Sequence, residues 1–259
     1  MQKETRPLIL ITNDDGYQAK GIYELAEVAK QFGEVVVVAP ESHYSGASHS
    51  VSMNVPLRVK QLKPRNGVAY YTVNGTPVDC VKAAKLVVLR NRKIDLLLSG
   101  INHGQNAAGS VSYSGTVDAA LEGAMENWKS LAFSLNDYDD DADFTTAKHF
   151  IAQIIERVLN AENYPAHITL NINIPQLPID KVKGIKIVSQ ANGFWNEDLE
   201  ERVDPHGQKY YWLTGAMENI EKKPGTCLHE LSEGYVVAQP VQFDVTAYQY
   251  IDGLKKMIE

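Results

Sequence analysis

The sequence predicts an α/β fold built on a doubly wound, mostly parallel sheet, with a C-terminal β-hairpin or arm region. Two observations predict it. Over residues 1–175, short apolar runs alternate with segments whose apolar residues recur at helical spacing, and this alternation is typical of a parallel sheet covered by helices. After about residue 175 the pattern changes to short strand-like runs with long connections. We therefore expect residues 1–175 to form the main domain and residues 176–259 to complete the same unit.

The strands come first. Continuous apolar runs, rather than alternating ones, suit strands that are buried on both faces. Such runs are Leu8–Thr12, Glu34–Ala39, Ile94–Leu98, Ser130–Leu135 and Ile168–Ile174. Residues 55–74 differ, because two strand-like runs flank Pro64 and Gly67 and predict a hairpin.

The helices lie between these runs. Helical spacing of apolar residues predicts helices at Gly21–Phe32, Pro77–Leu89, Thr116–Trp128 and Phe144–Asn160. Pro77 stands at the first position of its helix, where the missing N–H is not needed. Asp79 more naturally caps this helix than contacts a substrate.

The C-terminal region predicts an arm or a small β subdomain. Its strand candidates are Ile185–Ser189, Lys209–Leu213 and Tyr235–Val237. It also holds the aromatic residues Trp195, Tyr210, Tyr211 and Trp212. Exposed aromatics on an extended hairpin are typical of a protein interface, although a local hydrophobic cluster explains them equally well.

Composition excludes several classes of function. The chain has 259 residues, 44% hydrophobic content and a net charge of -7, which disfavours binding to a nucleic-acid polymer. The two cysteines, Cys80 and Cys227, are far apart and predict inert thiols rather than a disulfide. The N-terminal residues 1–7 are charged, and no apolar run approaches the length of a membrane span. We expect a soluble, cytoplasmic protein.

Two adjacent carboxylates, Asp14 and Asp15, directly follow the first strand. Ligands of open parallel sheets bind at the carboxyl ends of the strands. Neighbouring carboxylates repel unless a cation lies between them or one is protonated, and oxygen donors suit Mg²⁺ or Mn²⁺. Good turn chemistry in Asn13–Gly16 is the alternative explanation.

Two further polar, Gly-rich segments, at residues 40–48 and 99–106, also follow strand-like runs. We expect them to meet the first segment at one edge of the sheet. Ser114 is a good N-cap for the helix after it, and the free N–H groups there attract an anion such as phosphate. A cation bound beside an anion-binding site is suited to hydrolysing a phosphate ester, because the metal polarises a phosphoryl oxygen and activates water.

Five motifs together resemble the SurE (stationary-phase survival protein) family. They are Ile-Thr-Asn-Asp-Asp-Gly at 11–16, Ser-Gly-Ala-Ser at 45–48, Val-Asn-Gly-Thr-Pro-Val-Asp-Cys at 73–80, Ser-Gly-Ile-Asn-His-Gly-Gln-Asn at 99–106 and Tyr-Ser-Gly-Thr-Val-Asp-Ala-Ala at 113–120. The resemblance is specific over residues 8–135 and looser to about residue 250. It implies a Rossmann-like catalytic domain and a metal-dependent 5'/3'-nucleotidase, an acid-phosphatase-like hydrolase that releases phosphate from nucleoside monophosphates and acts on some short polyphosphate. It also implies a C-terminal segment exchanged between subunits in a homodimer or homotetramer.

The resemblance also implies which residues act. One divalent ion per subunit, Mg²⁺ or Mn²⁺, would be held by Asp14, Asp15, Ser45 and Asn102, and the catalytic residues would be Asp14, Asp15 and Asn102. The phosphate-binding positions would be Asn13, Ser45, Gly46, Asn106, Ser114, Gly115 and Thr116. The chain departs from the family pattern at Cys227, Glu230 and Tyr248, so the resemblance supplies no general acid from that region.

Other roles stay open. His43, His49 or His103 could protonate a leaving alkoxide, although each is more simply a surface or supporting histidine. A nucleotide-binding module without hydrolysis is an alternative function, but the first strand lacks a Gly-x-Gly-x-x-Gly turn. A third possible function is that of a mainly structural assembly protein, which the aromatic residues at 209–213 suggest.

Overall fold

A computed structural model describes residues 6–139 and 141–259. The charged N-terminal stretch therefore lies almost wholly outside the described residues. Within them, nine strands form one sheet in the order β3-β4-β2-β1-β5-β6-β7-β11-β8. The central strands β4, β2, β1, β5, β6 and β7 pair in parallel, which confirms the predicted fold class.

The bounds of the sheet strands are as follows: β1 Leu8–Thr12, β2 Glu34–Pro40, β3 Val59–Gln61, β4 Ala69–Val73, β5 Leu96–His103, β6 Lys129–Asn136, β7 Ile168–Pro175, β8 Ile185–Ile187 and β11 Val236–Gln242. The helices are α1 Lys20–Ala29, α2 Pro77–Ala83, α3 Gly115–Met125, α4 Thr145–Asn160, α5 Cys227–Ser232 and α6 Ile251–Ile258. Each predicted strand and helix of residues 1–175 is present, and β3 and β4 form the predicted antiparallel hairpin. None of the helices in the described residues is long and apolar enough to span a membrane.

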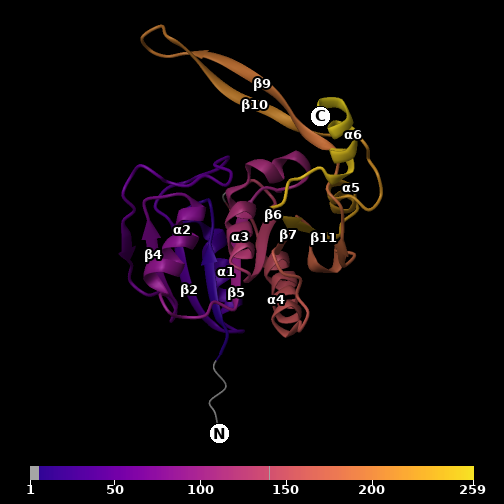
Figure 1. The fold of residues 1–259 in the computed structure, drawn as a ribbon. Helices are drawn as coiled ribbons and strands as arrows, with labels where there is room; N and C mark the ends of the chain where they lie inside the picture. Colours follow the sequence, from indigo (N-terminus) through magenta and orange to yellow (C-terminus); the bar gives the residue numbers. More distant parts are fainter. Residues whose placement is uncertain (1–5, 140) are drawn as a thin grey trace.

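Alternate residues of β1 pack on opposite faces of the sheet. Ile9 and Ile11 belong to the core cluster formed with α1 and α4. Leu8 and Leu10 belong to a second cluster formed mainly with α2. Because successive strand side chains point to opposite faces, a continuous apolar run is what a doubly covered strand requires. These helices on both faces are visible in Figure 1.

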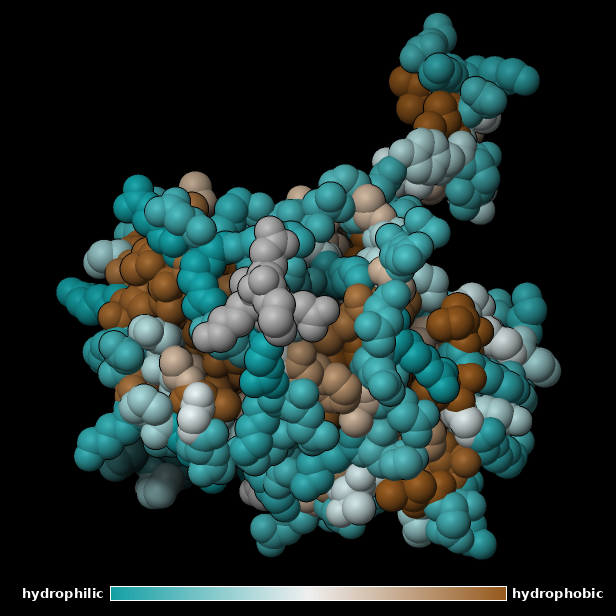
Figure 2. All heavy atoms as spheres, turned by 90° about the horizontal axis from the view of Figure 1, so that it is seen from below, coloured by the Kyte–Doolittle hydropathy of each residue, from teal (hydrophilic) through white to brown (hydrophobic). Residues whose placement is uncertain are grey.

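The C-terminal third is divided between the main sheet and a hairpin arm. The strands β8 and β11 join the main sheet, and β11 pairs antiparallel with β7 and parallel with β8. Of the strands in the described residues, only β9 (Gly193–Val203) and β10 (Lys209–Asn219) lie outside the sheet, as a two-stranded antiparallel hairpin. We call this hairpin, residues 193–219, the arm. It projects clear of the body beyond the carboxyl ends of the parallel strands (Figure 1) and carries exposed apolar side chains. Figure 2 shows the molecule from below, the side away from the arm, where apolar side chains lie scattered among polar ones.

Candidate functional site

The acidic pair lies where β1 ends, as the sequence predicts. Asp14 is buried, and its carboxylate accepts a hydrogen bond from the hydroxyl of Thr116 at the start of α3. Its main-chain carbonyl accepts a 2.8 Å hydrogen bond from the N–H of Tyr44, in the segment after β2. Burial, and then repulsion by Asp15, raises the pKa of Asp14 to about 6. The fold thus holds a carboxyl group where its negative charge is unfavourable without a partner.

Asp15 has an unsatisfied oxygen. Its Oδ2 is buried and has no hydrogen-bond partner among the described residues, while its Oδ1 lies 3.5 Å from Nδ1 of His43. Burial raises the pKa of Asp15, and His43 and His103 oppose that rise. A buried carboxylate oxygen without a donor is costly unless a cation or a ligand meets it.

The turn chemistry of this segment is also present. The side-chain N–H of Asn13 donates to the carbonyl of Gly16 at 2.9 Å, and Gly16 has a φ of +91°. The other side-chain atom of Asn13, Oδ1, is buried and has no partner among the described residues. Residues 13–16 can therefore both form a turn and bind a ligand, because the turn leaves the side-chain oxygen of Asn13 without a hydrogen-bond partner among the described residues.

The segment after β2 presents Ser45 and Gly46, which are both exposed. The hydroxyl of Ser45 lies 2.7 Å from Nε2 of His43, and Gly46 has a φ of +74° with no atom near the position of an added Cβ. His43 thus contacts both Ser45 and Asp15. This histidine links two of the predicted ligands.

The prediction that residues 99–106 form a loop is partly wrong. Strand β5 continues through His103, and only Gly104 and the residues after it form a loop. Asn102 therefore projects from a strand end that is fixed by pairing with β6. Its side-chain nitrogen donates to the carbonyls of His103 and Gly104 at 3.0 and 2.8 Å. Because both amide hydrogens are used, only the oxygen of this side chain is available to a cation.

Asn106 is fixed in place by several hydrogen bonds. Its main-chain N–H donates to Asn173 at 2.7 Å, and its side-chain nitrogen donates to Ser134 at 2.9 Å. Asn171 and Asn173 donate to its carbonyl. These buried polar contacts fix the loop after β5 to β6 and β7.

The start of α3 packs directly against the acidic pair. Ser114 is the N-cap, and its hydroxyl accepts a 3.2 Å hydrogen bond from the N–H of Val117, as predicted. A Cβ added to Gly115 would lie 2.9 Å from Cβ of Asp14. The absence of a side chain at Gly115 is what lets the helix N-terminus, with its free N–H groups, approach the carboxylate so closely.

A cavity of about 750 Å³ opens at this edge of the sheet. Of the residues predicted for the site, its lining contains Asp14, Ser45, Gly46, Asn102, Asn106 and Ser114. Asn13, Asp15, Gly115 and Thr116 are not part of the lining. They support it instead, through the contacts given above.

The arm supplies residues of the cavity that sequence reasoning missed. Trp195, Glu197, Leu213, Thr214 and Gly215 line it together with the strand-end residues. Trp195 drew attention in the sequence only as an interface or cluster residue. No local pattern indicates that a segment about 180 residues after Asp14 returns to this edge, because that contact depends on the tertiary fold.

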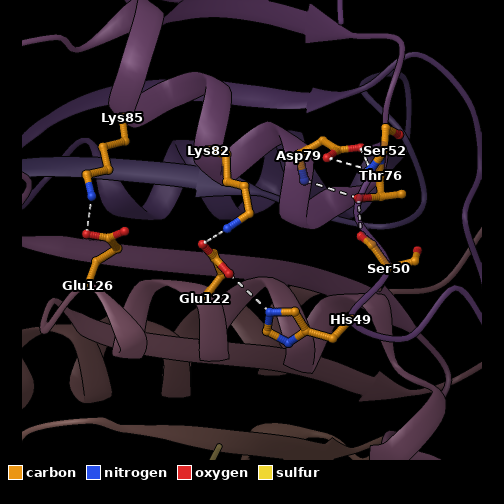
Figure 3. Close-up of polar contacts among 9 residues, drawn as sticks. All are labelled: His49, Ser50, Ser52, Thr76, Asp79, Lys82, Lys85, Glu122 and Glu126. Atoms are coloured by element: carbon orange, nitrogen blue, oxygen red, sulfur yellow. Dashed lines mark hydrogen bonds and ion pairs between the residues drawn. The ribbon is translucent and has the colours of Figure 1, made fainter. Parts of the chain in front are cut away.

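A polar network behind the cavity fixes the segment after β2 (Figure 3). His49 contacts Asp118 at 3.5 Å and Glu122 at 3.1 Å, and Lys82 pairs with the same Glu122. These hydrogen bonds and charges raise the pKa of His49 to about 9. His49 is thus a charged link between this segment and α3.

The helix α2 begins with a reciprocal cap, also drawn in Figure 3. The N–H of Asp79 donates to the hydroxyl of Thr76 at 3.1 Å, and the N–H of Thr76 donates to the carboxylate of Asp79 at 2.9 Å. Asp79 also accepts from the N–H of Ser52. The prediction that Asp79 is a capping residue is confirmed.

The residues that depart from the family pattern have structural contacts and do not line the cavity. The buried sulfur of Cys227 accepts from the N–H groups of Ala108 and Ala191 at 3.4 and 3.3 Å. Glu230 accepts from Lys186 at 2.5 Å, and Tyr248 donates to Asp244. Cys80 and Cys227 are free and buried, as predicted.

Few of the side chains that could bind a cation at this site are charged. The described residues contain no cluster of three or more His, Cys, Asp or Glu side chains placed to hold a metal ion. A cation at this edge would therefore depend on the two carboxylates together with neutral oxygens of Ser45 and Asn102. Such an all-oxygen set, with an unsatisfied carboxylate oxygen in it, fits a hard divalent ion.

Comparison with known proteins agrees with this geometry. The family model described as "Survival protein SurE" matches residues 9–197. A protein of Christiangramia forsetii named 5'-nucleotidase SurE is 45% identical over 96% of each chain, and one of Cytophaga hutchinsonii with the same name is 44% identical over 97% of each. The crystal structure of the SurE protein from Aquifex aeolicus superposes with a TM-score of 0.83 at 37% identity, covering 98% of this chain and all of that one. The chain therefore belongs to the SurE family.

Proposed function

We propose that this protein is a metal-dependent phosphomonoesterase that hydrolyses nucleoside 5'-monophosphates, and also 3'-monophosphates, to nucleoside and phosphate. The observation that carries the proposal is the buried pair Asp14 and Asp15 at the sheet edge, with a helix N-terminus packed against it. Two close relatives bear the name 5'-nucleotidase, which supports the substrate class. Short polyphosphate presents the same terminal group and belongs to the proposed range.

Asp14, Asp15, Ser45 and Asn102 would hold one divalent ion per subunit, Mg²⁺ or Mn²⁺. When bound, such an ion polarises a phosphoryl oxygen and lowers the pKa of a coordinated water. The support is chemical: all four donors are oxygens, and the hydrogens of the Asn102 amide are already committed to carbonyls.

The chain's own residues bind and orient the phosphate. The N–H groups at Gly115 and Thr116 begin α3, whose dipole favours an anion there. Asn13, Gly46, Asn106 and Ser114 complete the proposed pocket. The hydroxyl of Thr116 fixes the carboxylate of Asp14, which can then accept a hydrogen bond from the attacking water.

The test is phosphate release from a panel of 5'- and 3'-nucleoside monophosphates, in EDTA and after addition of Mg²⁺ or Mn²⁺. We expect turnover only with the metal, and its loss in Asp15→Asn. Binding of nucleotides without any phosphate release, under every metal condition, would support the alternative of a non-hydrolytic binding module and contradict the proposal.

We further propose that residues 1–175 act as the catalytic domain, and that residues 176–259 contribute the arm and an exchanged segment to a homodimer or homotetramer. Exposed apolar side chains on the arm, among them Leu199, Trp212 and Leu213, support self-association. Light scattering of the full chain and of a variant lacking residues 196–216 tests it, since only the full chain should be oligomeric. The proposed location is the cytoplasm, in keeping with two unpaired buried thiols.

A further inference from the structure

The cavity has two chemically different walls. One wall belongs to the body of the protein and contains the polar residues Asp14, Ser45, Asn102 and Ser114, which suit a phosphate, together with Tyr113 and Tyr138. The other wall is the arm, which contributes indole, carboxylate and aliphatic groups. A volume of about 750 Å³ lies within the range of pockets that enclose whole small molecules rather than a lone anion. The second wall therefore has room to contact the rest of a substrate.

One face of the arm lines the cavity. Trp195 and Glu197 are two residues apart on β9, so their side chains share a face of the hairpin. On β10, Gly215 is the register partner of Glu197, and residues directly opposite each other share a face. A Cβ added to Gly215 would lie 2.5 Å from the carbonyl oxygen of Asn196, so glycine at this position lets the two strands of the hairpin approach closely.

The root of the arm is anchored, which makes this wall rigid. The indole N–H of Trp195 donates to the hydroxyl of Ser110 at 3.1 Å. A Cβ added to Gly109 would lie 3.0 Å from the carbonyl of Gly193, and one added to Gly193 would lie 3.0 Å from Leu228. Trp195 nevertheless remains 39% exposed, so an aromatic surface is held at the cavity without being covered.

Glu197 brings a selective acceptor. It is exposed, and it forms no ion pair with another described residue. A carboxylate has only acceptor atoms and binds two adjacent N–H donors best. Guanine offers such a pair in its ring N–H and its 2-amino group, whereas hypoxanthine lacks the amino group and uracil has a single N–H.

We propose that the arm is the nucleoside subsite of this enzyme, in which Trp195 stacks on the base and Glu197 selects guanine, so that the preferred substrate is a guanine nucleoside monophosphate. The inference rests on the proposed function and specifies its substrate. It gives the arm a second role, since the segment expected to join subunits also forms part of the active-site cavity of its own chain.

The experiment measures kcat and KM of the full chain for GMP, IMP, UMP and glycerol 2-phosphate, which carries no ribose, base or other aromatic group. The variants are Trp195→Ala and Glu197→Gln. The matched control for the carboxylate, Glu200→Gln, changes the same residue type on the arm at a position outside the cavity lining.

We expect Trp195→Ala to raise KM about tenfold for every nucleotide, because base stacking on an aromatic side chain contributes about that much to affinity. Glu197→Gln should lower kcat/KM for GMP about tenfold and abolish the preference for GMP over IMP. Neither variant should change turnover of glycerol 2-phosphate or the oligomeric state measured by light scattering. The control Glu200→Gln should behave as the wild type in every assay.

The inference is overturned if both variants keep wild-type KM values for nucleotides, or if turnover of glycerol 2-phosphate falls in parallel with that of GMP. Failure of the proposed function gives a different result, namely no phosphate release by the wild type from any substrate. In that case calorimetric titration with GMP in EDTA decides the subsite: weaker binding by Trp195→Ala supports it, and equal or absent binding overturns it.

Discussion

Gly115→Ala is the substitution whose effect follows most directly from the packing. The added methyl group would lie 2.9 Å from Cβ of Asp14 and 3.2 Å both from its Oδ2 and from Cγ of Pro77. Carbon atoms pack favourably at about 3.5–4.0 Å, so Asp14 and the start of α3 must separate by roughly 0.6 Å or more.

A displacement of that size at a reacting centre lowers the rate by about 10- to 100-fold, or about 1.4–2.7 kcal/mol in the activation barrier. Overpacking of a tight site also destabilises a protein by about 1–3 kcal/mol. The assay is kcat/KM for a nucleoside monophosphate in saturating Mn²⁺, with the folded fraction checked by thermal denaturation.

Gly253→Ala in α6 is the matched control, because a Cβ there meets no atom within 4 Å and the residue is also helical. It should leave activity unchanged. If Gly115→Ala folds and keeps wild-type kcat/KM, then the close approach of α3 to Asp14 is not needed for activity, and the reasoning is wrong.

Three further predictions concern the surroundings of the site. Thr116→Val keeps the shape but removes the hydroxyl donor to Asp14, so kcat/KM should fall about tenfold and unfolding free energy by about 1–2 kcal/mol, measured by kinetics and urea denaturation. The pKa of His49 is raised from 6.5 to about 9, so its contribution to the free energy of unfolding is complete below about pH 6.5 and is lost as the pH rises through 9. Between pH 7 and pH 10 the wild type should therefore lose about 2 kcal/mol of unfolding free energy relative to His49→Gln. Equal pH profiles of the two proteins would contradict the link. Saturation with Mn²⁺ at about 100 times its Kd should stabilise the wild type by about 2.7 kcal/mol in thermal scans, and Asp15→Asn should show none of this gain.

The centre of the fold could be predicted because local and tertiary preferences agree there. The Leu8–Thr12 run is apolar on both faces, and the structure buries both faces. The polar segments after β1 and β2 meet at one edge because parallel strands place their ends together. The capping roles of Ser114 and Asp79 follow from side-chain chemistry that acts within three residues.

The parts that could not be predicted depend on distant partners. Strand β5 runs past Ser99 to His103 because β6 continues beside it, although those residues look like a loop. The short strands β8 and β11 look like a separate subdomain until β7 is seen to pair with β11. Strand β9 is highly charged and exposed, so no hydrophobic alternation marks it, and its contact with the cavity is fixed only by the packing of its root.

The most direct test of the central claim is phosphate release from a nucleoside 5'-monophosphate by the wild type and by Asp14→Asn, each in saturating Mn²⁺ and in EDTA. The account predicts turnover by the wild type with Mn²⁺ and a loss of at least a hundredfold both in EDTA and in the variant, because the buried carboxylates at the end of β1 would hold the ion. Turnover by folded Asp14→Asn at the wild-type rate would contradict the assignment of this edge of the sheet as the active site.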